Sequence, residues 1–237
     1  MAGKLSIVGV GPGDPGLVTV KAARVLQTAR YVFVPVAAAG KNSLAHEIAK
    51  QYIPPGTDVV ELLFPMVRDR DQVQSHYFRN YEIIESVVRK GHDAAFLTIG
   101  DPCTYSTSWP LFTLFEGKAP DIQVEVVSGI SSYADGAARA AENLAEGDEI
   151  LSIVSAYDSL ERINRVIDIS DTVVFLKTYK ERTRLLELIR KRDLMRQCIY
   201  IKRCGLEGQE IIDDLGNMPD DPDYLSMIIL KKKKNTA

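Results

Sequence analysis

The stretch Gly9-Val-Gly-Pro-Gly-Asp-Pro-Gly16 follows directly on the apolar run Leu5–Val8 and decides how the chain begins to fold. Four glycines and two prolines in eight residues neither continue a strand nor start a helix, so they predict a tight loop of nearly bare backbone. A helical pattern from Leu17 to Arg30 comes next. A strand, a glycine loop and a helix in this order are typical of open α/β sheets, which bind ligands at the carboxyl ends of their strands.

This loop does not have the composition of a phosphate-binding loop. Where a P-loop has Gly-Lys-Ser/Thr, the chain reads Asp14-Pro-Gly-Leu17. A dinucleotide fingerprint needs a small residue at its third glycine position, and Asp14 stands there, while Pro12 lacks an amide that could donate to phosphate. The loop therefore predicts a ligand that is neutral or positively charged at the point of contact. A purely structural turn is the alternative.

Composition excludes several other classes of protein. The chain has 237 residues, 46% of them hydrophobic, and a formal net charge of −3, which gives no reason to expect nucleic acid or an anionic membrane as a partner. We interpret Lys231–Lys234 as a solvated tail. Cys103, Cys198 and Cys204 show no Cys-x-x-Cys spacing, which indicates a reducing compartment and no metal site. No apolar run reaches the length of a signal peptide or a membrane span, so we expect a cytoplasmic protein.

The spacing of strand-like and helical patterns predicts an α/β protein of two domains. In the first half, β-branched runs alternate with helical patterns, which is typical of a mainly parallel sheet covered on both faces. In the second half the last three expected strands are too close together for helical crossovers, so we expect antiparallel pairing and a mixed sheet; they are Ile199–Lys202, Glu210–Asp213 and Leu225–Leu230. We place the domains at residues 1–128, with the glycine-rich loops, and 129–237.

Two further glycine loops follow expected strands of the first domain. Thr98-Ile-Gly-Asp-Pro-Cys-Thr-Tyr-Ser-Thr107 comes after the apolar segment Ala94–Thr98, and Val127-Ser-Gly-Ile-Ser-Ser132 comes after the next strand. Either loop alone is compatible with an ordinary helix cap. Three such loops at the carboxyl edge of one sheet predict a ligand crevice there.

The ordered motifs GVGPGDPG, TIGDPCTYST and VSGISS resemble those of the tetrapyrrole (corrin/porphyrin) methylases, and the resemblance covers nearly the whole chain. It implies methyl transfer from S-adenosylmethionine, giving S-adenosylhomocysteine, to a carbon atom of a tetrapyrrole. The segments Glu61–Met66, Ala94–Thr107 and Asp171–Lys177 are most similar to the branch of the family that methylates carbon-20 of precorrin-2 or cobalt-factor II in cobalamin biosynthesis. The resemblance also implies two α/β domains with the cofactor in the cleft between them, and a homodimer.

Carried over residue by residue, the resemblance assigns a cofactor site without assigning a catalytic residue. The cofactor-binding positions that it implies are Pro12, Ile99, Gly100, Asp101, Thr104, Ser131, Ser132, Lys177 (or Leu176) and Gly205. The family often has Pro-Gly where this chain has Ser128-Gly129, a difference that concerns the stiffness of the third loop. The sulfonium group of this cofactor is a cation without an N–H group, so we expect oxygen atoms of the protein next to it. Whether Asp101 contacts the sulfonium, the ribose or only the loop backbone stays open.

The tetrapyrrole carries many carboxylates, so basic residues are expected around it. Arg68 and Arg70 are the leading pair for substrate binding, followed by Lys177 and Arg203. The residue that removes a proton from the methylated carbon is unknown; candidates by type alone are His46, His76, His92, Glu61 and Tyr105. Alternatives are a sibling enzyme that methylates another position, a related methylase such as diphthine synthase, and a regulatory nucleotide-binding module. The sequence also leaves open whether the substrate contains cobalt.

Overall fold

The structure is a computed structural model that describes residues 2–38, 40–65, 67, 69–219 and 223–232. The chain divides into two compact units, residues 1–131 and 132–237, so the division falls three residues after the expected one. Each unit is an α/β structure built on its own five-stranded sheet. Within the described residues, every helix is too short or too polar to cross a bilayer.

The alternating pattern predicted a mainly parallel sheet in the first unit, and the sheet is parallel at every strand pair. Its strands lie in the order β3-β2-β4-β1-β5. Their bounds are β1 (Leu5–Gly9), β2 (Tyr31–Val36), β3 (Asp58–Leu63), β4 (Ala94–Thr98) and β5 (Val124–Val127). All residues of β1 and β4 are buried, which explains why these strands read as continuous apolar runs without alternation.

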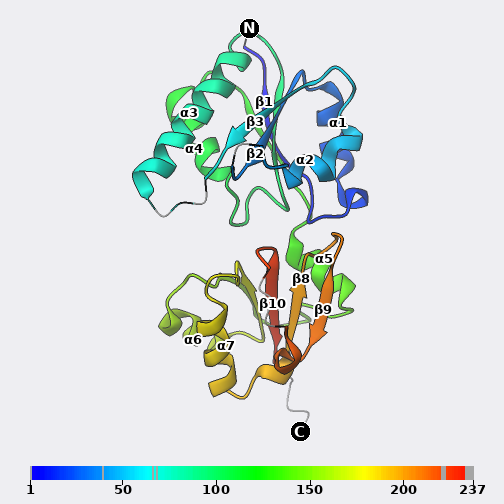
Figure 1. Cartoon of the computed structure of the whole chain (residues 1–237), viewed down its shortest axis with the longest axis vertical. Helices are drawn as coiled ribbons and strands as arrows, with labels where there is room; N and C mark the ends of the chain where they lie inside the picture. Colours follow the sequence, from blue (N-terminus) through cyan, green and yellow to red (C-terminus); the bar gives the residue numbers. More distant parts are fainter. Residues whose placement is uncertain (1, 39, 66, 68, 220–222, 233–237) are drawn as a thin grey trace. The chain divides into compact units, whose positions relative to one another are not determined.

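Helices cover both faces of this sheet, with α1 and α2 on one side and α3 and α4 on the other (Figure 1). Their bounds are α1 (Val20–Thr28), α2 (Leu44–Ala49), α3 (Arg70–Val88) and α4 (Trp109–Lys118), with short 3₁₀ turns η1 (Pro15–Leu17) and η2 (Lys50–Tyr52). Leu26 and Ile48 pack on one face, and Ile84 and Phe115 on the other; all four are fully or almost fully buried. Helix α3 begins after its cap Asp69, whose side chain accepts hydrogen bonds from the amides of Asp71 and Gln72.

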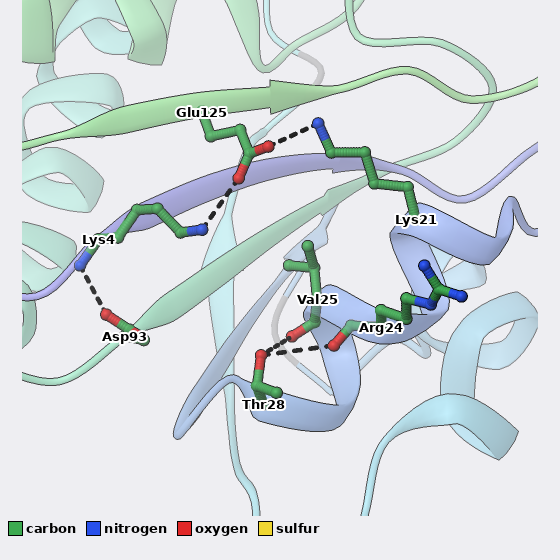
Figure 2. A network of polar contacts seen from close by, with 7 residues as sticks. All are labelled: Lys4, Lys21, Arg24, Val25, Thr28, Asp93 and Glu125. Carbon is green, nitrogen blue, oxygen red and sulfur yellow. Dashed lines mark hydrogen bonds and ion pairs between the residues drawn. The ribbon is translucent and has the colours of Figure 1, made fainter.

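Ion pairs hold the edge strand β5 to its neighbours (Figure 2). The carboxylate of Glu125 lies 3.0 Å from the ammonium of Lys4 and 2.6 Å from that of Lys21, which is on α1. Hydrogen bonds from Lys21 and Lys4 hold the pKa of Glu125 below its ordinary value. These contacts join β5 and α1, the elements next to two of the three glycine loops.

The second unit has a mixed sheet in the order β6-β7-β10-β8-β9. Its strands are β6 (Leu151–Ser155), β7 (Thr172–Leu176), β8 (Cys198–Lys202), β9 (Glu210–Asp213) and β10 (Ser226–Lys231). Only the β6–β7 pair is parallel, and the last three strands pair antiparallel as expected. Helices α6 (Leu160–Ile169) and α7 (Arg182–Lys191) cover one face and α5 (Ser132–Arg139) the other, as Figure 1 shows; η3 (Met195–Gln197) and η4 (Leu215–Asn217) are short turns.

The buried thiol of Cys198 is expected to make the protein less stable as the pH rises above 9. Cys198 is 2% exposed at the start of β8 and donates to the carbonyl oxygen of Leu194 at 3.3 Å. Burial, helped by the carboxylate of Asp214, raises the pKa of Cys198 from 9.0 to about 12. Between these values the unfolded chain loses the proton and the folded chain keeps it, so the stability that the protonated thiol contributes is lost as pH rises.

We therefore expect the Cys198→Ala variant to lose stability less steeply than the wild type above pH 9. The two slopes of unfolding free energy against pH should differ by about 1.4 kcal/mol per pH unit. Urea unfolding from pH 9 to pH 11 measures this difference, and the range from pH 6 to pH 8, where both states hold the proton, is the control. Parallel curves in the alkaline range would contradict the buried, protonated thiol.

Candidate functional site

The three glycine loops follow three adjacent strands of the first sheet. Their strands are β4, β1 and β5, which lie side by side in that order. Because all three strands are parallel, their carboxyl ends lie at one edge, and the loops meet there. An antiparallel bridge joins Gly11 and Gly100, with the Gly100 amide donating to the Gly11 carbonyl oxygen at 2.8 Å.

The loops approach one another so closely that only glycine fits at two positions. A methyl carbon added to Gly9 would lie 2.6 Å from the carbonyl oxygen of Gly100 and 2.7 Å from the amide nitrogen of Gly129. One added to Gly129 would lie 2.1 Å from the same carbonyl oxygen. Gly100 itself is buried and has φ of 70°, a conformation that favours glycine, although an added methyl would meet nothing nearer than the Ile130 carbonyl oxygen at 4.0 Å.

Asp101 fastens the second loop to the third. Its Oδ1 accepts a hydrogen bond from the amide of Cys103 at 2.8 Å, and its Oδ2 accepts one from the amide of Gly129 at 3.1 Å. Each carboxylate oxygen therefore has a backbone partner in the loops. Of the three roles that the sequence left open for Asp101, the contact with the loop backbone is the one these bonds show.

A chain of hydroxyl groups fixes the rest of the second loop, and sequence reasoning missed it. The Oγ1 of Thr98 lies 2.8 Å from the Oγ of Ser106, which lies 2.7 Å from the Oγ of Ser108. Outside this chain, the phenol of Tyr77 on α3 donates to the carbonyl oxygen of Thr107 at 3.0 Å. The hydroxyl-rich run from residue 104 to residue 107 was the available signal.

The chemistry of these loops fits a cationic ligand better than a phosphate. Residues 9–16, 98–107 and 127–132 contain no lysine or arginine, and their charged side chains are those of Asp14 and Asp101. Pro12 is buried, Ile99, Asp101 and Thr104 are half-buried, and Ser131 follows Gly129 by two residues. The structure thus gathers the predicted positions Pro12, Ile99, Gly100, Asp101, Thr104 and Ser131 on three joined loops.

The remaining predicted cofactor positions lie in the second unit. Ser132 is the first residue of α5, and Gly205 follows β8 with φ of 73°. Cys204 links these two segments, because its Sγ lies 3.2 Å from the Oδ2 of Asp135 and 3.8 Å from the carbonyl oxygen of Ser132. The same Oδ2 accepts a hydrogen bond from Nε of Arg139 at 2.8 Å. The acid-base pair four residues apart on α5 was a sequence signal for the contact between Asp135 and Arg139, but not for the contact with Cys204.

Lys177 comes directly after β7, in the left-handed backbone region at φ of 59°. Although the residue is exposed by area, the loss of water around its ammonium lowers the pKa of Lys177. Next to it, the Oγ1 of Thr178 lies 2.8 Å from the Oγ of Ser226, which begins β10. Lys177 is therefore held at the end of β7, beside the start of the neighbouring strand.

The residues predicted to contact the substrate are only partly described. Arg68 lies outside the described residues, and Arg70 is exposed as the first residue of α3. A cation at a helix N-terminus opposes the helix dipole, so Arg70 is not placed there to stabilise α3. Among the described residues, no cluster of histidine, cysteine, aspartate or glutamate is arranged to hold a metal ion.

The chain is an α/β protein of two units. The first has a parallel sheet with glycine loops at its carboxyl edge, and the second has a mixed sheet. The chain matches the model of the Tetrapyrrole (Corrin/Porphyrin) Methylases over residues 4–219. It belongs to this family, and the resemblance carried by the three motifs is confirmed.

Within the family, the chain is similar over its whole length to two enzymes of one kind. It is 38% identical to a probable cobalt-precorrin-2 C(20)-methyltransferase of Methanocaldococcus jannaschii, across 96% of this chain and 95% of that protein. It is 30% identical to the cobalt-precorrin-2 C(20)-methyltransferase of Salmonella typhimurium, across 98% of both.

Solved structures share the fold at lower sequence identity. A uroporphyrin-III C-methyltransferase from Thermus thermophilus, crystallised with S-adenosylhomocysteine, matches with a TM-score of 0.69 at 20% identity over 97% of both chains. Cobalt precorrin-4 methyltransferase matches with a TM-score of 0.70 at 20% identity over 96% of this chain and 94% of that chain. The fold of two α/β units, one with a parallel and one with a mixed sheet, is therefore that of the tetrapyrrole methylase structures.

Proposed function

We propose that this protein is an S-adenosylmethionine-dependent methyltransferase that acts on carbon-20 of precorrin-2 or of its cobalt complex, cobalt-factor II, in cobalamin biosynthesis. The observation that carries the proposal is the edge made by β4, β1 and β5, where three loops without basic residues pack backbone to backbone. The full-length similarity to two carbon-20 methyltransferases supports the choice of substrate.

The residues that would hold the cofactor in the first unit are Pro12, Ile99, Gly100, Asp101, Thr104 and Ser131, and those in the second are Ser132, Lys177 and Gly205. S-adenosylmethionine, when bound, supplies a methyl group on a positively charged sulfur. The glycine loops bring backbone close together at the edge of the sheet, and Asp101 fixes two of the loops in place. Positioning of this kind contributes up to about 7–11 kcal/mol to lowering the barrier of a transfer reaction.

The carboxylates of the tetrapyrrole require basic partners, and we assign Arg68 and Arg70 to this role. Arg70 is exposed at the start of α3, where its positive charge interacts unfavourably with the helix dipole. Reversing the charge of both arginines should weaken binding of cobalt-factor II and leave S-adenosylhomocysteine binding unchanged. Equal affinity of the double variant and the wild type for cobalt-factor II would exclude the pair from the substrate site.

The proposal is tested first by calorimetry and then by mapping the product. We expect the protein to bind S-adenosylhomocysteine and to give no heat with ATP or NAD. Incubation with methyl-labelled S-adenosylmethionine and either precorrin-2 or cobalt-factor II should place the label on carbon-20, and the faster substrate identifies the metal state. Binding of ATP or NAD in place of S-adenosylhomocysteine would favour a nucleotide-binding module. A label on another carbon, or on a diphthamide precursor alone, would favour a sibling enzyme.

We also infer that the protein works in the cytoplasm as a homodimer. The spacing of its cysteines supports a reducing compartment, and the resemblance to the family supports the dimer. Sedimentation at micromolar concentration should give twice the mass of 26.3 kDa. A single species at the monomer mass would refute the dimer and leave the proposed chemistry intact.

A further inference from the structure

Three large side chains among the described residues stand on left-handed backbone, each in a loop that follows a strand. Within the described ranges, six non-glycine residues have positive φ. Ala141 and Asp193 follow the ends of α5 and α7, and Asp214 lies in the turn before η4; a small residue or aspartate at such positions is ordinary. The other three are large: Tyr105, Lys177 and Arg203.

Of these three large residues, Tyr105 is the one in the first unit, and its backbone conformation is energetically unfavourable. It has φ of 50° in the loop after β4, four residues beyond Asp101. A non-glycine residue in this region costs on the order of 1–2 kcal/mol, and glycine or asparagine would adopt it more easily. Backbone strain of this kind is retained where the surrounding structure enforces it and where the side chain is needed.

The loop around Tyr105 enforces that conformation from both sides. The amide of Thr104 donates to the carbonyl oxygen of Asp101 at 3.4 Å. On the other side, Ser106 is held inward by its hydroxyl contacts with Thr98 and Ser108 at 2.8 and 2.7 Å. With both neighbours fixed, the side chain of Tyr105 is left 46% exposed.

An aromatic ring held exposed beside the cofactor loops fits one kind of ligand. Its flat apolar face can pack on a conjugated macrocycle and exclude water from it. We propose that Tyr105 is a substrate-contacting residue, whose ring packs against the tetrapyrrole at the methyl-accepting edge. The inference rests on the proposed function and deepens it. The proposed role belongs to the ring and not to the hydroxyl group, because the contact is one of apolar packing.

The test separates the ring from the backbone. Tyr105→Gly removes both ring and strain, whereas Tyr105→Phe keeps both and removes only the hydroxyl. For Tyr105→Gly we expect a melting temperature no lower than that of the wild type, and a dissociation constant for cobalt-factor II raised roughly 10- to 100-fold. Tyr105→Phe should bind cobalt-factor II as the wild type does, and S-adenosylhomocysteine affinity should be unchanged in both variants. Binding is followed by quenching of protein fluorescence under anaerobic conditions.

The matched control is Ala141→Gly, which relieves the same left-handed conformation (φ of 52°) in the second unit. It should keep its melting temperature and its affinity for cobalt-factor II. Three results would overturn the role of Tyr105: unchanged affinity in Tyr105→Gly, equal loss in Tyr105→Phe and Tyr105→Gly, or a lowered melting temperature with weaker S-adenosylhomocysteine binding. Failure of the proposed function is distinguishable, because the wild type and Ala141→Gly would then not bind cobalt-factor II either.

Discussion

Replacing Gly129 by alanine is expected to destroy the proposed cofactor site. The added methyl carbon would lie 2.1 Å from the carbonyl oxygen of Gly100, and 2.8 and 2.9 Å from the carbonyl carbon and Cα of Gly9. All three atoms are backbone, so no side-chain rotation can relieve the overlap. The loops must separate, or the protein must accept a destabilisation of about 3 kcal/mol.

Either response removes the loop arrangement that the proposed cofactor site requires. We expect Gly129→Ala to bind S-adenosylhomocysteine at least about 100-fold more weakly than the wild type, a loss of about 2.7 kcal/mol. Calorimetry measures the affinity and urea unfolding measures the stability. An affinity within threefold of the wild type would show that the contact among the three loops is not needed for binding.

Gly117→Ala is the matched control because it makes the same chemical change with the opposite expected sign. Gly117 is exposed within α4, and an added methyl would meet nothing within 4 Å. Alanine is favoured over glycine inside a helix by about 0.8–1.0 kcal/mol. We expect this variant to be slightly more stable than the wild type and to bind S-adenosylhomocysteine equally well.

The sequence was sufficient for the fold because local and long-range signals agreed. Strands β1 and β4 are buried along their whole length, so they appear as apolar runs such as Ala94–Thr98, each leading into a loop that contains glycine. In the second unit, the short spacing between β8 and β9 left room only for antiparallel pairing. The loops could be assigned to one edge because parallel strands share their carboxyl ends.

What the sequence could not give were contacts between distant side chains and backbone groups. Nothing in the motif GDP shows that Asp101 reaches the amide of Gly129, 28 residues away. The thiol of Cys204, which contacts Asp135 from a separate strand end, had no pattern to reveal it. Such contacts depend on which strands are neighbours, and the order β4-β1-β5 is a property of the folded sheet alone.

Changing Asp101 to asparagine should weaken the site through geometry, with no change in size. Both carboxylate oxygens of Asp101 accept backbone hydrogen bonds, from Cys103 at 2.8 Å and from Gly129 at 3.1 Å. An amide offers only one acceptor oxygen, so one of the two backbone N–H groups would face an NH₂ group. An N–H group left without its acceptor costs about 1–3 kcal/mol.

The missing hydrogen bond destabilises the ordered arrangement of the loops. We therefore expect a larger effect on the affinity for S-adenosylhomocysteine than on the free energy of unfolding. We expect Asp101→Asn to bind S-adenosylhomocysteine about 10- to 100-fold more weakly, with a modest fall in unfolding free energy. Asp171→Asn is the matched control, since Asp171 accepts the amide of Ile150 at 2.8 Å through one oxygen, a bond that asparagine can keep. If both variants bind S-adenosylhomocysteine as the wild type does, Asp101 does not fasten the site. Asp101→Ala removes both acceptor oxygens, whereas Asp101→Asn keeps one. If the two variants lose the same affinity, one acceptor oxygen alone does not hold the loops, and both are required.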